Sequence, residues 1–133
     1  MQLDFSGLPT VLPALLKGTL VTVELTVAVL VIATPLGALV ALARSSPSAP
    51  VRTSVMVLSW IFRGIPPLLL LFFAFFALPF MGIRLSPLPS AVVAMSAYMA
   101  FYFAEAFIGG LNSVPRGQWQ AARALGVSPS RTL

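Results

Sequence analysis

The chain has 133 residues, of which 59% are hydrophobic and 8% are charged, and its mean hydropathy is +1.00. A soluble domain of this length carries about a quarter charged residues, so the composition excludes an ordinary water-soluble domain and indicates a membrane protein. The net charge of +5 comes from basic residues spread along the chain without a cluster of interleaved aromatics, which excludes a nucleic-acid partner.

Three long apolar segments predict three membrane-spanning helices, at residues 12–43, 53–80 and 87–110. Each contains a charge-free run of about 20 residues, the length that crosses a hydrocarbon core of about 30 Å. A polar segment, 111–133, follows the third span. We therefore expect an all-α membrane protein embedded in a lipid bilayer.

The basic residues are distributed unequally between the two sides of the predicted bundle. Because Lys and Arg are in excess on the cytoplasmic side, the loop 44–52 and the segment 111–133 are expected inside, and the N-terminus and the turn 81–89 outside. The residues that decide this orientation are Arg44, Arg52, Arg116, Arg123 and Arg131 on the inner side, and Lys17 and Arg84 on the outer side.

The second span contains an arginine followed closely by two prolines, in the run 63–67. Consecutive prolines lack N–H donors and leave backbone carbonyls unpaired, which a membrane tolerates only where protein or a water-filled cavity covers them. We predict a helix break at which Arg63, Gly64 and Pro66 line a substrate pathway. The alternative is a kink near the cytoplasmic interface, with Arg63 extended to the lipid headgroups.

Glu105 is a further charge expected within the membrane, near the cytoplasmic end of the third span. Antiparallel spans two and three bring Arg63 and Glu105 to comparable depth, so we assign Glu105 to the same pathway and predict that the two residues pair. The alternative is that each reaches the interface separately. In the first span, Lys17 and Glu24 share a helical face and are interpreted as a packing or interfacial pair, with substrate contact as the alternative.

Small residues recur every four positions in the first and third spans. Such stripes let helices approach closely in lipid, where packing rather than hydrophobicity drives association. We interpret them as structural. The residues are Ala33, Gly37 and Ala41 in the first span and Ser96, Ala100 and Ala104 in the third.

The polar segment contains a predicted short helix from Pro115 to Leu125. Ser113 is a candidate N-terminal cap, Pro115 suits a first turn, and Gly126 can end the helix in the left-handed conformation. Its alanines give a smooth surface, and Trp119 and Leu125 offer anchors for a groove on a partner. A short helix of this kind between membrane segments is typical of a docking element.

Three motifs, in order along the chain, resemble the polar amino acid branch of the ABC-type importer permeases (the histidine/glutamine/arginine type). Residues 112–126 resemble the cytoplasmic coupling loop known as the EAA motif, although Gln120 stands where that motif usually has Glu. Residues 102–110 resemble Y-x-A-E-x-x-R-G-G, and residues 62–66 with Leu78-Pro79 resemble F-R-G-T-P…L-P. The similarity covers nearly the whole chain.

The resemblance implies that residues 1–133 are part of the transmembrane domain of a permease in the bacterial cytoplasmic membrane. Family members continue through further spans, so the chain is expected to be C-terminally truncated. Its implied partners are a cytoplasmic ABC ATPase dimer, a second permease subunit forming a homodimer or heterodimer, and an extracytoplasmic solute-binding protein. The residues implied to contact the ATPase are Gly117, Gln118, Gln120, Ala121, Ala122, Ala124, Leu125 and Gly126.

Other classes of protein fit the sequence less well. The chain lacks the catalytic residues of an intramembrane hydrolase, because it has no His and no Cys. It also has no phosphate loop, and neither a metal nor a cofactor is expected. ATP hydrolysis is therefore expected in a separate subunit. Two alternatives stay open: a permease for osmolytes or other small solutes, and a structural membrane subunit with no transport role.

Overall fold

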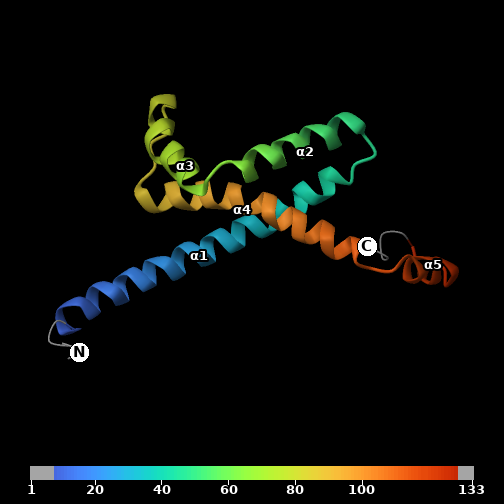
Figure 1. The fold of residues 1–133 in the computed structure, drawn as a ribbon, viewed down its shortest axis with the longest axis horizontal. Coiled ribbons are helices and arrows are strands. Elements are labelled where there is room, and N and C mark those ends of the chain that lie inside the picture. The colour runs from blue at the N-terminus through green and yellow to red at the C-terminus, as the bar shows by residue number, and fades with distance from the viewer. Residues whose placement is uncertain (1–7, 129–133) are drawn as a thin grey trace, which may run out of the picture.

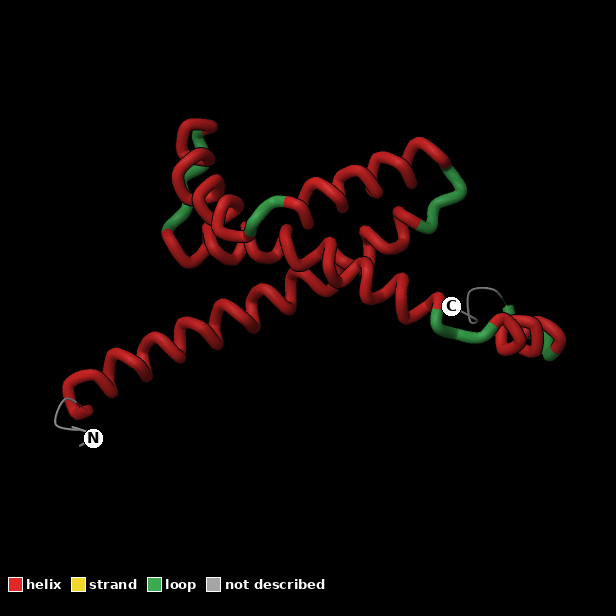
Figure 2. The backbone as a smooth tube through the Cα atoms, in the orientation of Figure 1, coloured by secondary structure: helices red, strands yellow, loops and turns green. Residues whose placement is uncertain are grey.

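The computed structural model describes residues 8–128, and helices and connecting turns account for the whole of that range (Figure 2). Two helices are each long and apolar enough to cross a membrane, and a bent pair makes a third span if it is counted as one. This confirms the predicted all-α membrane fold. In chain order the elements are α1 (Leu8–Arg44), α2 (Ala49–Gly64), α3 (Pro67–Phe72), η1 (Phe73–Ala77), η2 (Leu78–Met81), α4 (Pro87–Asn112) and α5 (Arg116–Ala124).

The core is the crossing of α1 and α4, which form an X in Figure 1. A methyl group added at Gly37 would lie 2.7 Å from the Cβ of Phe103 and 2.9 Å from the carbonyl oxygen of Ala100, so only glycine permits this approach. Ala33 and Ala104 have an exposed fraction of 0%. The small-residue stripes therefore pack against each other, as predicted.

The N-terminal half of α1 extends away from this crossing (Figure 1). Every residue from 11 to 24 is exposed, and nothing lies within 4 Å of a methyl group added at Gly18. The hydroxyls of Thr19, Thr22 and Thr26 donate to carbonyls one turn earlier in the same helix. These three hydroxyls are thus satisfied without a partner helix.

The second expected span, 53–80, is broken at the predicted place. α2 and the segment Pro67–Met81 meet at an angle of 97°, because neither Pro66 nor Pro67 can donate the hydrogen bond that would continue α2. Beyond the break the chain forms α3, a π-helical turn and a 3-10 turn in succession. This helical segment ends at Gly82, whose left-handed φ of 85° favours glycine. The break is therefore much sharper than a kink.

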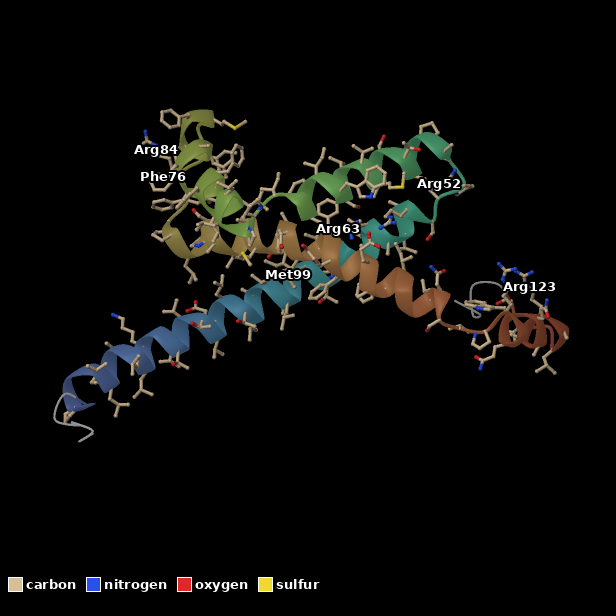
Figure 3. All side chains as sticks on the ribbon, viewed as in Figure 1. Arg52, Arg63, Phe76, Arg84, Met99 and Arg123 are labelled. Carbon is tan, nitrogen blue, oxygen red and sulfur yellow. The ribbon has the colours of Figure 1, made fainter. Side chains whose placement is uncertain are left out.

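α2 lies against α4 through a stacked pair of rings, Phe62 and Phe101, whose centroids are 4.6 Å apart. The labelled arginines show how the ends of the molecule are arranged (Figure 3). Arg52 and Arg123 lie toward the end that carries α5, whereas Arg84 lies toward the opposite end. This separation is the one that the uneven charge distribution predicts.

Candidate functional site: a charged helix junction and an exposed helix

Three charged side chains from three helices meet beside the α1–α4 crossing, and we call them the Glu105 cluster: Arg44, Arg63 and Glu105. The Nη2 atom of Arg63 lies 2.9 Å from Oε1 of Glu105, so the predicted pair forms. Nη1 of Arg44, the last residue of α1, donates to the same oxygen. One carboxylate oxygen therefore joins α1, α2 and α4.

The Glu105 cluster is half-buried, with exposed side-chain fractions of 20% for Arg44, 29% for Arg63 and 31% for Glu105. Charge pairs in such surroundings are screened less than surface pairs, and each unpaired member would be costly. Arg63 is also fixed from behind, because its Nε atom donates to the carbonyl of Ser59 at 3.2 Å. Two cations around one anion leave a surplus of one positive charge.

The helix break adjoins this cluster. Gly64 and Pro66 are both exposed there, and the carbonyl oxygen of Arg63 lies 3.5 Å from the hydroxyl of Tyr102, a weak contact at the limit for a hydrogen bond. The hydroxyl of Tyr98 is 3.0 Å from that of Tyr102. The structure thus gathers Arg63, its backbone carbonyl, Glu105 and two phenolic hydroxyls near one interruption of the second span.

α5 forms over residues 116–124, close to the predicted 115–125. Its C-terminus has the arrangement in which a left-handed glycine ends a helix: Gly126 has a φ of 75°, and the N–H groups of Gly126 and Val127 donate to the carbonyls of Arg123 and Ala122. The expected cap at the other end is wrong. Ser113 does not cap α5 but donates its hydroxyl to the carbonyl of Gly110, where α4 ends.

α5 packs against no other helix within residues 8–128, and Figure 1 shows it beyond the end of α4. Leu125, with an exposed fraction of 84%, is an apolar side chain with no cover. The residues expected to contact an ATPase are all exposed except Ala122, which is half-buried: Gly117, Gln118, Gln120, Ala121, Ala124, Leu125 and Gly126. This surface is available to a partner.

The structure differs from the sequence predictions at three charged residues, Lys17, Glu24 and Arg44. Lys17 and Glu24 form no ion pair in the described part of the chain, because seven residues of helix separate them by about 10 Å along the axis. Arg44 was interpreted only as a marker of orientation, but it is a partner of Glu105. The signal for this contact is present in the sequence. Arg44 lies at the end of the first span and Glu105 within the third, and both are predicted near the same side of the membrane.

A family model described as "Binding-protein-dependent transport system inner membrane component" matches residues 33–133. The chain belongs to this family of transport-system membrane components.

Several curated relatives carry amino-acid transport names. The L-cystine transport system permease protein TcyB of Bacillus subtilis (strain 168) is 36% identical over 91% of this chain and 52% of its own length. The arginine transport system permease protein ArtQ of the same organism is 34% identical over 96% of this chain and 58% of its own length. The glutamate/aspartate import permease protein GltK of Escherichia coli O157:H7 is 36% identical over 96% and 60%. The chain thus spans 52–60% of the length of these relatives.

A solved structure shares the fold. The crystal structure of an amino acid ABC transporter with histidines superposes with a TM-score of 0.88 at 26% sequence identity. The match covers 99% of this chain and 62% of that chain. The arrangement of the helices is therefore similar to that in a chain of this transporter.

Proposed function

We propose that this chain is part of the permease subunit of an ATP-driven importer that moves polar amino acids across the bacterial cytoplasmic membrane. The observation that carries the proposal is α5, an exposed helix after a membrane span, with the residues of the coupling motif on its surface. The relatives support the substrate class, because their names specify cystine, arginine, and glutamate or aspartate.

In this proposal, a cytoplasmic ATPase dimer supplies the energy and α5 is seated in a groove of one ATPase subunit. A second permease subunit, identical or different, completes the pathway, and an extracytoplasmic binding protein delivers the amino acid. The positions of Arg52, Arg84 and Arg123 support an orientation with α5 in the cytoplasm and the N-terminus outside.

The substrate pathway is proposed to run past the helix break. Arg63 and Glu105 provide opposite charges for an α-carboxylate and an α-ammonium group. Gly64 and Pro66 are exposed at the break, where Pro66 and Pro67 leave the carbonyls of Phe62 and Arg63 without helical partners. Charges and interrupted helices inside membranes are typically found where polar solutes pass.

Co-purification with the ATPase tests the proposal. An Ala121→Arg substitution places a long charged side chain on the exposed alanine surface of α5, and we expect it to remove most of the ATPase from the purified complex and to abolish import. Ser48→Arg is the matched control, since Ser48 is exposed in the turn between α1 and α2, on the same predicted side, and lies outside residues 112–126. Retention of the ATPase by Ala121→Arg, or its absence from the wild-type complex, would contradict the proposal.

A further inference from the structure

Within residues 8–128, α5 is connected to the membrane helices only through α4. It makes no packing contact with any other element of the described range, and the short connection 113–115 follows α4 directly. A displacement of α5 therefore reaches the helices described here by way of α4 (Figure 1).

The last turns of α4 are not packed tightly against α1. A cavity of about 690 Å³ lies between the ends of the two helices, with Phe107 and Leu111 of α4 on one side and Leu42 of α1 on another. Glu105 lies two turns before the end of α4. The Glu105 cluster is therefore the first polar connection to other helices that a movement of α5 meets as it travels along α4.

The two arginines connect Glu105 to different helices, α1 and α2. Arg44 belongs to α1, which is fixed to α4 by close packing around Gly37. Arg63 belongs to the end of α2, directly before the break, and is anchored on its own helix at the Ser59 carbonyl. Since Nη1 of Arg44 and Nη2 of Arg63 approach the same oxygen, a shift of the carboxylate toward one arginine lengthens its bond to the other.

We infer that Arg44 is a positioning residue that couples α5 to the helix break. It holds the Glu105 carboxylate against α1, so that a movement of the end of α2 relative to α1 lengthens the contact between Arg63 and Glu105 and opens the break. Without Arg44, Glu105 and Arg63 shift together as one neutral pair, and α4 moves without opening the break. This inference rests on the proposed transport function and adds a role for a residue outside the α5 surface and the helix break.

The ratio of ATP hydrolysed to amino acid imported, measured on the complete transporter in vesicles, tests the inference. Arg44→Gln is expected to raise this ratio about tenfold, the effect of losing one half-buried charge partner. Arg44→Lys keeps the charge and is expected to stay within about threefold of wild type. Arg52→Gln is the matched control: Arg52 lies at the same end of the molecule but donates to the carbonyl of Ser46 and does not contact Glu105.

The outcomes separate the inference from the proposed function. A wild-type complex without ATP-dependent import overturns both. Import by the wild type with an unchanged ratio in Arg44→Gln, or an equal rise in Arg52→Gln, overturns the inference alone.

A second neutral substitution covers the case in which Arg44→Gln does not accumulate. Arg44→Met keeps much of the length of the side chain without its charge, and we expect the same rise in the ratio. An unchanged ratio in Arg44→Met contradicts the inference.

Discussion

Both halves of α1 carry large apolar side chains, but they differ in what they pack against. In the N-terminal half, large side chains such as Leu20, with an exposed fraction of 70%, find no protein partner. In the C-terminal half, every fourth residue from Val29 to Ala41 is buried against α4. The difference follows side-chain size rather than hydrophobicity, because lipid solvates leucine as well as another helix does, and only small residues allow backbones to approach.

The largest effect is expected from replacing a small residue by a large one at two matched glycines, one in each half of α1. Gly37→Leu forces a side chain into the space held by Phe103 and the backbone of Ala100, and should lower the free energy of unfolding by about 3 kcal/mol or prevent assembly. Gly18→Leu meets open space and should change it by less than about 0.5 kcal/mol. Thermal unfolding in detergent measures both, and equal effects at the two sites would break the comparison.

A smaller effect is expected at the two glutamates of the spans. Glu105→Gln leaves two guanidinium groups close together without their shared anion, and should destabilise the fold by about 1–2 kcal/mol, less than for a fully buried pair because the cluster is partly exposed. Glu24→Gln removes a charge that has no ion-pair partner in the described residues. Melting temperatures that fall by the same amount in both variants would show that the ion pairs add nothing.

The smallest effect is expected at Ser96, on the α4 face that packs at the crossing. Its hydroxyl is buried and has no hydrogen-bond partner in the described part of the chain, so Ser96→Ala removes an unpaired polar group at little cost in volume. We expect unchanged stability or a gain of up to about 1 kcal/mol. Ser59→Ala, which loses the hydrogen bond to the Val55 carbonyl, serves as the control. A clear loss of stability in Ser96→Ala but not in Ser59→Ala would show that the Ser96 hydroxyl, and not only close packing, stabilises this face.

The sequence predicts those parts of the fold that residue periodicity and backbone chemistry determine. The four-residue spacing around Gly37 and Ala100 predicts which faces meet, and Pro66 with Pro67 predicts where the second span breaks. The 97° angle at that break is beyond prediction, since it depends on what α3 packs against rather than on the missing donors alone.

The site is predictable only in part for the same reason. Arg63 and Glu105 were expected to meet because antiparallel spans place them at one depth. Arg44 joins them because α1 crosses α4 at a particular angle and position, which no residue spacing within one helix determines. Ser113 ends α4 rather than starting α5, since either neighbouring helix offers a suitable partner for its hydroxyl.

The most direct test of the account is whether α5 touches an ATPase. The chain has no cysteine, so a single Gln120→Cys on the exposed face of α5 can be cross-linked in the active complex, with Gly18→Cys on the unpacked half of α1 as control. The account predicts a covalent product of the permease and the ATPase for Gln120→Cys and none for Gly18→Cys. An importing complex that yields no such product, or a Gln120→Cys thiol labelled from outside intact cells, would contradict it.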